Sequence, residues 1–111
     1  MSPTDDLPAI DVSALADLGP GSVPLFDVRQ PDEYAEGHVP GAVLVPLGEV
    51  PDHLADFPTD RPVYVVCRSG ARSTNACGFL RASGVDAINV TGGTLAWIEA
   101  GFDVVAGGEP G

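Results

Sequence analysis

Short β-branched runs alternate with helix-like stretches along this chain of 111 residues, and no other feature constrains its fold as strongly. Residues 63–67, Val-Tyr-Val-Val-Cys, form a continuously apolar run, as expected for a parallel strand that is covered on both faces. The sequence predicts strands at residues 8–12, 23–28, 42–45, 63–67 and 86–90. Strands that alternate with helices in one chain predict an α/β fold, with a mostly parallel sheet flanked by helices.

Proline, glycine and capping residues mark the helices between these strands. Ser13 is predicted to cap a helix over residues 14–18, and Pro31 suits the first position of a helix that Gly37 ends. Three further helices are predicted, over residues 51–56, 71–83 and 93–100. In the second of these, four side chains at i, i+3, i+4, i+7 spacing are expected to meet the sheet: Ser73, Ala76, Cys77 and Leu80.

The length suits one domain, which we place at residues 7–105, between a loose N-terminus (1–6) and a loose Gly-rich tail (106–111). Sixteen acidic residues against five arginines give a net charge of −11, which argues against nucleic-acid and membrane partners. No apolar run approaches the roughly 20 residues that span a bilayer. The acidic start and the two cysteines favour a cytoplasmic protein with reduced thiols.

Cys67 ends the most hydrophobic predicted strand and opens the loop Cys67-Arg-Ser-Gly-Ala-Arg72, which leads into a predicted helix. Ligands of parallel sheets bind at the carboxyl ends of the strands, and a helix N-terminus aims N–H groups at such a ligand. Gly70 permits the tight curvature, and the guanidinium groups of Arg68 and Arg72 are expected to lower the pKa of the thiol. The loop is therefore predicted to hold a nucleophilic thiolate. The alternative is a buried cysteine at a strand end beside solvated arginines.

Four segments stand in order between residue 27 and about residue 105: Asp27-Val-Arg-Gln-Pro-Asp-Glu-Tyr34, Gly37-His-Val-Pro-Gly-Ala42, Cys67-Arg-Ser-Gly-Ala-Arg-Ser73, and Gly92-Gly-Thr-Leu-Ala-Trp97 with Gly101. In these segments and their spacing, the chain resembles the single-domain rhodanese-like sulfurtransferase family, which implies an α/β fold. The resemblance implies that Cys67 takes the outer sulfur of a donor such as thiosulfate as a persulfide. Cyanide, a thiol or another protein then removes that sulfur, and neither a metal nor an organic cofactor is required.

The resemblance also assigns a cradle for the persulfide, in which the loop N–H groups stabilise its negative charge. The cradle residues are Arg68, Ser69, Gly70, Ala71 and Arg72.

Two other functions remain open. Related phosphatases and arsenate reductases place seven residues from Cys to Arg, whereas this loop has six, and the smaller cradle suits a single sulfur atom. Alternatively, the domain is a persulfide-carrying or sensing module that signals to a partner protein.

Some thiosulfate-using rhodaneses carry Lys where this chain has Ser69, and Arg where it has Glu33. Glu33 is instead expected to pair with Arg29, which leaves Arg68 and Arg72 to bind the anion.

Two supporting residues follow the second predicted strand. Asp27 either accepts loop N–H groups, as the family implies, or caps a turn. Arg29 is expected to form a structural ion pair with Glu33 or another nearby carboxylate. Two cysteines and two histidines without paired spacing predict no zinc site.

Four further positions have structural interpretations. His38 is expected to bind backbone groups in its own turn, and Cys77 is expected to be a core thiol rather than a resolving cysteine. Gly92 and Gly93, between a strand and a helix, offer an anion nest. Trp97 is expected to pack the last helix against the sheet.

Overall fold

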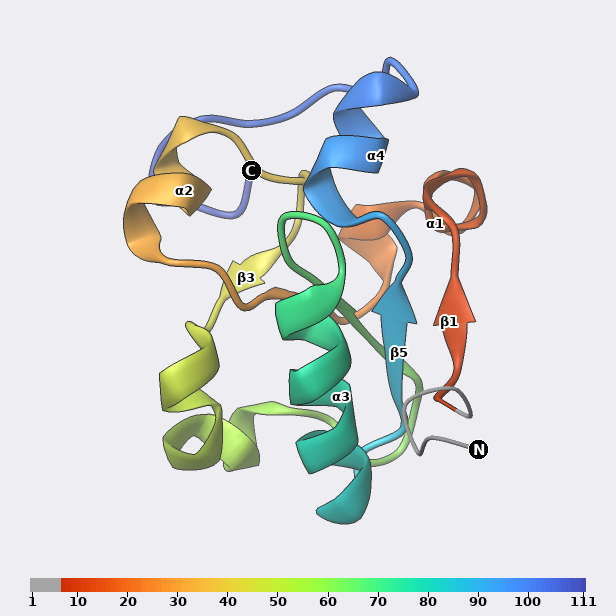
Figure 1. The fold of residues 1–111 in the computed structure, drawn as a ribbon, viewed down its shortest axis with the longest axis vertical. Coiled ribbons are helices and arrows are strands. Elements are labelled where there is room, and N and C mark those ends of the chain that lie inside the picture. Colours follow the sequence, from red (N-terminus) through yellow and green to blue (C-terminus); the bar gives the residue numbers. More distant parts are fainter. Residues whose placement is uncertain (1–6) are drawn as a thin grey trace.

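Five short parallel strands form a sheet in the computed structural model, which describes residues 7–111 (Figure 1). The strands are β1 (Ala9–Ile10), β2 (Leu25–Asp27), β3 (Val43–Leu44), β4 (Val63–Val66) and β5 (Ala87–Val90). Each strand lies inside a predicted run and each strand pair is parallel, which confirms the α/β fold. The spatial order β1-β5-β4-β2-β3 places β4 at the centre of the sheet.

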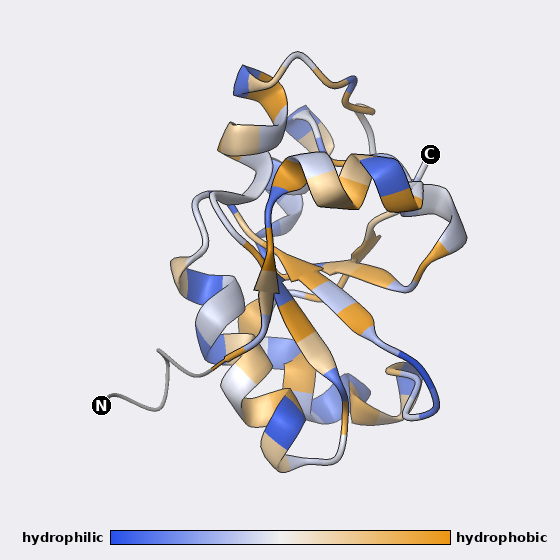
Figure 2. Ribbon diagram, turned by 90° about the vertical axis from the view of Figure 1, so that its right-hand side faces the viewer, coloured by the Kyte–Doolittle hydropathy of each residue, from blue (hydrophilic) through white to orange (hydrophobic). Residues whose placement is uncertain are grey.

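Helices cover both faces of this sheet. They are α1 (Val12–Leu18), α2 (Pro31–Glu36), α3 (Ala71–Ala82) and α4 (Gly93–Glu99), with the 3₁₀ segments η2 (Pro20–Ser22) and η3 (Leu47–Asp56). One core cluster joins α3 and η3 to the sheet, and a second joins α1, α2 and α4 to its opposite face. Figure 1 shows α3 in front of the strands, and Figure 2 shows apolar strands between the helical layers.

The position of β4 explains its continuous apolar run. Val65 packs in the core cluster beside α3, whereas Tyr64 and Val66 pack in the cluster beside α1, α2 and α4, and all three are buried. The predicted inward face of α3 is confirmed, because its buried residues are Ser73, Ala76, Cys77 and Leu80.

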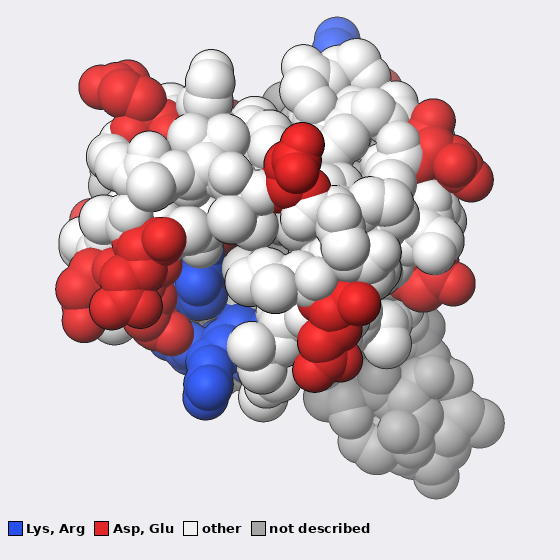
Figure 3. Space-filling model, turned by 90° about the horizontal axis from the view of Figure 1, so that it is seen from above, with Lys and Arg blue, Asp and Glu red and all other residues white. Residues whose placement is uncertain are grey.

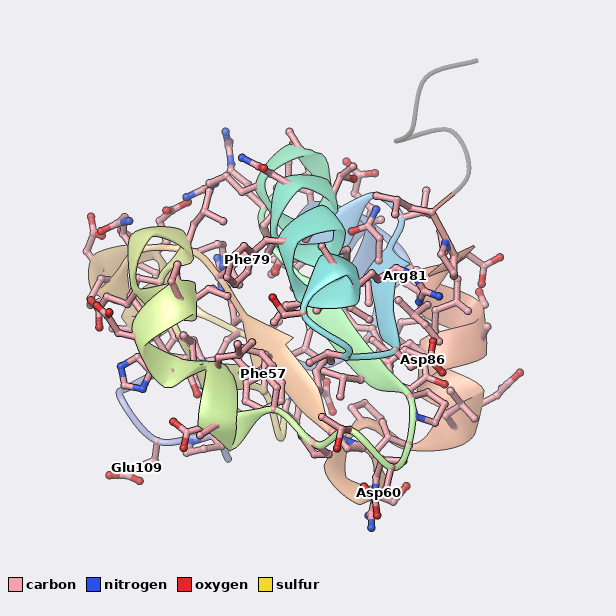
Figure 4. All side chains as sticks on the ribbon, turned by 90° about the horizontal axis from the view of Figure 1, so that it is seen from below. Phe57, Asp60, Phe79, Arg81, Asp86 and Glu109 are labelled. Carbon is pink, nitrogen blue, oxygen red and sulfur yellow. The ribbon has the colours of Figure 1, made fainter. Side chains whose placement is uncertain are left out.

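The far end of α3 is anchored to the start of β5. Arg81 Nη1 lies 2.9 Å from Asp86 Oδ1 and donates to the carbonyl oxygen of Ala87 at 3.0 Å, and Figure 4 shows Arg81 beside Asp86. Phe57 closes the same end of the core against Phe26, with ring centroids 4.3 Å apart. The N-terminus of α3 therefore lies at the opposite end of the sheet, beside the carboxyl ends of the strands.

Two predicted helix starts are wrong. α1 begins before residue 14, because the Asp11 carboxylate accepts the backbone N–H of Ala14 at 2.8 Å, so that Asp11 and not Ser13 is the cap. The helix predicted to begin at Pro51 is instead part of η3, in which His53 departs from helical dihedral angles (φ −111°, ψ 17°). Pro51 has no N–H to donate, which interrupts a regular series of helical hydrogen bonds in this segment.

The two chain ends differ in what the structure describes. Residues 1–6, predicted as a loose N-terminus, lie outside the described residues. The tail at residues 106–111 is hydrogen-bonded to the region of α2, since Gly107 N–H donates to the carbonyl oxygen of Ala35 at 2.8 Å. His38 Nε2 lies 2.8 Å from the carbonyl oxygen of Glu109, and Nδ1 lies 2.8 Å from that of Tyr34. The ring therefore binds backbone groups, but in α2 and the tail and not in its own turn as predicted. Within residues 7–111, no helix has the length and apolar character needed to cross a membrane.

Candidate active site

Cys67 follows the last residue of β4, at the carboxyl edge of the sheet, and is only 1% exposed. The loop turns at Gly70, whose φ of +115° lies in the left-handed region that favours glycine. The backbone N–H of Gly70 donates to Cys67 Sγ at 3.1 Å, and the hydroxyl of Ser73, in the first turn of α3, lies 3.3 Å from the same sulfur. The strand, the turn and the start of the helix therefore meet at one sulfur atom.

These donors favour the thiolate form of Cys67. Burial raises the pKa of the thiol, but hydrogen bonds from the Ser73 hydroxyl and from backbone N–H groups of the loop outweigh it and lower the pKa below its ordinary value. The backbone donors are those of Ser73, Gly70 and Ser69. The pKa of the second thiol, Cys77, is raised to about 12, chiefly by burial, in keeping with the predicted core position.

The N-terminus of α4 holds the loop carbonyls away from the sulfur. Thr94 N–H donates to the carbonyl oxygen of Cys67 at 2.8 Å, and Leu95 N–H donates to that of Arg68 at 3.0 Å. Gly93 allows this approach, because a β-carbon there would lie 2.5 Å from the Cys67 carbonyl oxygen. The helix start that follows the glycine pair thus binds loop carbonyls, and the anion nest at Gly92 and Gly93 stays a prediction. With its carbonyls held on α4, the loop is left with its N–H groups toward Sγ.

A buried network of hydroxyls and one amide fixes Ser73. The side-chain oxygen of Asn89 on β5 is another acceptor within reach of the Ser73 hydroxyl, and Asn89 Nδ2 donates to Thr74 Oγ1 at 3.1 Å. The Thr74 hydroxyl in turn donates to the carbonyl oxygen of Gly70 at 2.7 Å. Neither Asn89 nor Thr94 was predicted from the sequence to belong to the site. The available signals were one polar residue inside an apolar strand and a threonine directly after two glycines.

The guanidinium group of Arg72 already has an acidic partner. Glu33 binds it through both carboxylate oxygens, at 2.7 and 2.9 Å. The hydrogen bonds from Arg72 lower the pKa of Glu33 to about 2, and the same pairing raises the pKa of Arg72. The expected pairing of Glu33 with Arg29 is wrong, because Glu33 in the first turn of α2 meets the first turn of α3. Of the two arginines expected to bind an anion, only Arg68 remains without a carboxylate partner among the described residues.

Arg29 pairs with Asp27 instead. Its Nη2 lies 2.8 Å from Asp27 Oδ2, and the same carboxylate accepts the backbone N–H of Arg29 at 3.0 Å. Of the two roles considered for Asp27, the turn cap is the one observed. Arg29 also donates to the carbonyl oxygen of Gly37 at 2.9 Å, which ties the end of β2 to the turn after α2.

A pocket of about 340 Å³ opens beside the loop. Arg68 lines it together with Thr94 and Leu95 of α4. Figure 3 looks onto this edge of the molecule and shows arginine atoms in a hollow that acidic side chains flank.

Two predicted cradle residues, Ser69 and Ala71, have exposed side chains. Among residues 7–111, no three His, Cys, Asp or Glu side chains gather in a way that could hold a metal ion.

Residues 12–100 match the Rhodanese-like domain family. The chain belongs to this family. A protein named sulfurtransferase from Allochromatium vinosum is 41% identical over 83 residues, which cover 74% of this chain and 78% of that protein. The crystal structure of a rhodanese-related protein from Thermoplasma volcanium matches with a TM-score of 0.82 at 30% identity, over 88% of this chain and 97% of that chain. A rhodanese-like domain protein from Staphylococcus aureus matches with a TM-score of 0.77 at 38% identity, over 82% and 91% of the two chains.

The match covers every side chain described around the sulfur. In this rhodanese-like domain, the matched residues 12–100 extend from α1 to the end of α4. They include the Cys67 loop and the elements that orient it, together with the Glu33–Arg72 pair. The family indicated by the sequence motifs is thereby confirmed.

Proposed function

We propose that this rhodanese-like protein is a sulfurtransferase that carries sulfane sulfur as a persulfide on Cys67. The family match and the similarity to the Allochromatium sulfurtransferase support sulfur transfer in general. The observation that carries the proposal is the Cys67 Sγ atom, buried at the end of β4 with the Gly70 N–H at 3.1 Å and the Ser73 hydroxyl at 3.3 Å. Such a site holds a nucleophilic sulfur and the negative charge that a persulfide carries.

The proposed reaction is a double displacement. The Cys67 thiolate attacks the outer sulfur of a donor such as thiosulfate, and the electron pair of the broken S–S bond leaves with sulfite. The product is a Cys67 persulfide anion, whose charge the loop N–H groups stabilise as an oxyanion hole stabilises oxygen. A thiolate, another protein or cyanide then attacks the terminal sulfur, and Cys67 regains its thiolate.

The arrangement of the arginines disfavours a phosphatase or arsenate reductase. Those reactions need a cation to bind an oxyanion opposite the thiolate. Here both oxygens of Glu33 hold the guanidinium group of Arg72, the last residue of the loop. The proposal therefore remains sulfur transfer, whether to a small thiol or to a partner protein.

Intact-protein mass after treatment with a sulfane donor tests the proposal. We expect the mass of one added sulfur atom, its removal by cyanide, and its loss in Cys67→Ala. Cys77→Ala is the matched control and is expected to keep the adduct, because burial raises the pKa of Cys77 to about 12. An adduct that persists in Cys67→Ala, or none with any sulfane donor, would contradict the proposal.

A further inference from the structure

One polar side chain lies inside the apolar sheet beside the reactive loop. Asn89 is on β5, in register with Val65 of the central strand β4, and is only 9% exposed. Its amide reaches the first turn of α3, where Nδ2 donates to Thr74 Oγ1 at 3.1 Å and Oδ1 lies within reach of the Ser73 hydroxyl. No hydrogen bond among the described residues joins Asn89 to Cys67 Sγ, so Asn89 acts on this sulfur only through its neighbours.

The amide of Asn89 determines which way the Thr74 hydroxyl points. Because Thr74 Oγ1 accepts from Nδ2, its own proton goes to the carbonyl oxygen of Gly70, at 2.7 Å. The backbone N–H of Thr74 donates to the same carbonyl at 3.0 Å. A carbonyl oxygen has two lone pairs, and these two donors occupy both. The Ser73 hydroxyl, 3.1 Å from this carbonyl, is therefore left with two acceptors, Cys67 Sγ and Asn89 Oδ1.

The charge on Cys67 decides between these two acceptors. A thiolate attracts the Ser73 proton more strongly than a neutral amide oxygen does. Asn89 Oδ1 is then buried without a donor, because the Ser73 hydroxyl is the one donor that residues 7–111 bring to it. In the protonated thiol, or in a persulfide whose charge lies on the terminal sulfur, the hydroxyl turns to Asn89 and both groups are satisfied.

We propose that Asn89 is a positioning residue for sulfur transfer, which competes with the Cys67 thiolate for the proton of Ser73 and thereby favours the persulfide over the empty site. The inference rests on the proposed function, since it requires the persulfide on Cys67. Asn89 takes no part in bond making, and its effect passes through the orientation of one hydroxyl group.

Loading moves sulfur and charge but no proton. The Cys67 thiolate bonds to the outer sulfur of thiosulfate, the S–S bond of the donor breaks, and its electron pair leaves with sulfite. The Ser73 proton stays on Oγ, and the hydroxyl rotates from Sγ to Asn89 Oδ1. The step needs neither an oxidant nor a reductant.

Asn89→Ala removes the competing acceptor, and the pH profile of Cys67 alkylation by iodoacetamide is the first measurement. In a Cys77→Ala background the profile is expected to move to lower pH, with a roughly fivefold larger thiolate fraction below its midpoint, as for one hydrogen bond between neutral groups. Loss of packing alone would loosen the donors of the loop and move the profile to higher pH. Asn75→Ala is the matched control, because Asn75 is an exposed asparagine of α3, and this control is expected to leave the profile unchanged.

The charged side chains around the loop are the same in every variant. They are the pairs Glu33–Arg72 and Asp27–Arg29 together with the pocket residues Arg68 and Glu36. A shift in the profile therefore reports a change in hydrogen bonding to the sulfur and not a change in the charges around it.

Loading at equilibrium is the second measurement. The protein is mixed with thiosulfate and sulfite at a fixed ratio, at a pH above the alkylation midpoint, and the ratio of persulfide to unmodified protein is read from intact mass. Asn89→Ala is expected to lower this ratio roughly fivefold, because the persulfide loses the acceptor of the Ser73 hydroxyl. In a Ser73→Ala background, Asn89→Ala is expected to change neither the ratio nor the profile, since it acts through Ser73 alone.

The outcomes separate this inference from the proposed function. A profile that does not move to lower pH in Asn89→Ala, a loading ratio that changes no more than in Asn75→Ala, or effects of equal size in the Ser73→Ala background overturn the role of Asn89. In each case loading of Cys67 still upholds sulfur transfer. If no sulfane donor loads Cys67, the proposed function fails, and the inference fails with it.

Two provisions keep the test decisive. If Asn89→Ala does not fold, Asn89→Leu, which keeps a branched side chain without its polar atoms, replaces it with the same expectations. If thiosulfate loads too little protein to measure, the alkylation profiles of the single and double variants decide the role of Asn89.

Discussion

At the scale of single residues, the hydroxyl of Ser73 is the hydrogen-bond donor that lowers the pKa of Cys67 most. This hydroxyl has three acceptors within reach: Cys67 Sγ at 3.3 Å, the carbonyl oxygen of Gly70 at 3.1 Å and the side-chain oxygen of Asn89. Its one proton serves one acceptor at a time, and a charged thiolate is the strongest of the three. In the proposed persulfide the charge moves to the terminal sulfur, which leaves the proton to Asn89.

Ser73→Ala is expected to raise the pKa of Cys67, because the buried thiolate loses a donor. A hydrogen bond to a charged group contributes roughly 1.5–3 kcal/mol, so alkylation of Cys67 by iodoacetamide at pH 7 is expected to slow about tenfold or more. The pH profile of alkylation, measured in a Cys77→Ala background, is expected to move to higher pH. Ser83→Ala removes the same atom at the far end of α3 and serves as control. An unchanged profile in Ser73→Ala would contradict this account.

At the scale of elements, the site forms where β4, α3 and α4 meet. α3 supplies the Ser73 hydroxyl to the sulfur, and the first turn of α4 takes up the loop carbonyls through Thr94 and Leu95. α4 is only seven residues long, so its position depends on this close approach to the loop. Gly93 is the residue at which the two backbones come nearest, with both loop carbonyl oxygens within 2.6 Å of a hypothetical β-carbon.

Gly93→Ala is therefore expected to push α4 away from the loop. An alanine in the left-handed conformation costs about 1–2 kcal/mol of unfolding free energy, and the two strained hydrogen bonds add about 1–3 kcal/mol. Gly101→Ala is the control, because Gly101 also has a positive φ (+87°) but no atom within 4 Å of its β-carbon. Urea unfolding is expected to show a larger loss of unfolding free energy for Gly93→Ala than for Gly101→Ala. Alkylation of Cys67 is also expected to be slower in Gly93→Ala. Equal losses for both variants would mean that the approach of α4 does not constrain the loop.

At the scale of the whole molecule, negative charge is in large excess. Sixteen acidic residues face five arginines. Four of these arginines, at positions 29, 61, 72 and 81, are already paired with carboxylates. The radius of gyration is 12.6 Å, so the unpaired carboxylates lie at separations comparable to the screening length of about 8–10 Å at ordinary ionic strength. Their mutual repulsion destabilises the compact chain.

Sodium chloride is therefore expected to raise the melting temperature at pH 7. An increase in ionic strength from about 0.01 M to about 1 M shortens the screening length from about 30 Å to about 3 Å. Each kcal/mol regained corresponds to about 4–8 °C in a domain near this size. Near pH 4, where many carboxyl groups are protonated, the rise measured by calorimetry is expected to shrink. A melting temperature that falls with salt at pH 7, or an equal rise at both pH values, would contradict this charge argument.

Most of the secondary structure was predicted correctly from residues that are close together in the sequence. The five strands lie within the predicted runs because each run consists mainly of apolar residues, and Pro8, Gly41 and Pro62 stand at or directly before the start of three of them. α2 starts at Pro31 and is followed by Gly37, as predicted. Proline has a fixed φ and glycine a freely variable one, and both properties affect only the residues beside them, so these two helix ends can be predicted locally. The position of Cys67 between β4 and α3 follows from the same local reasoning.

By itself, then, the sequence determined the elements, the buried face of α3 and the loop that carries the reactive sulfur, because these depend on residues a few positions apart. Only the tertiary structure decided the strand order, the Glu33–Arg72 pair across 39 positions and the bond from Thr94 to the Cys67 carbonyl across 27. Glu33 was expected to bind Arg29, four positions away, but the fold places the first turn of α2 beside the first turn of α3, where Glu33 binds Arg72. Such contacts depend on how the elements pack in space, which hydrophobic and turn patterns leave open.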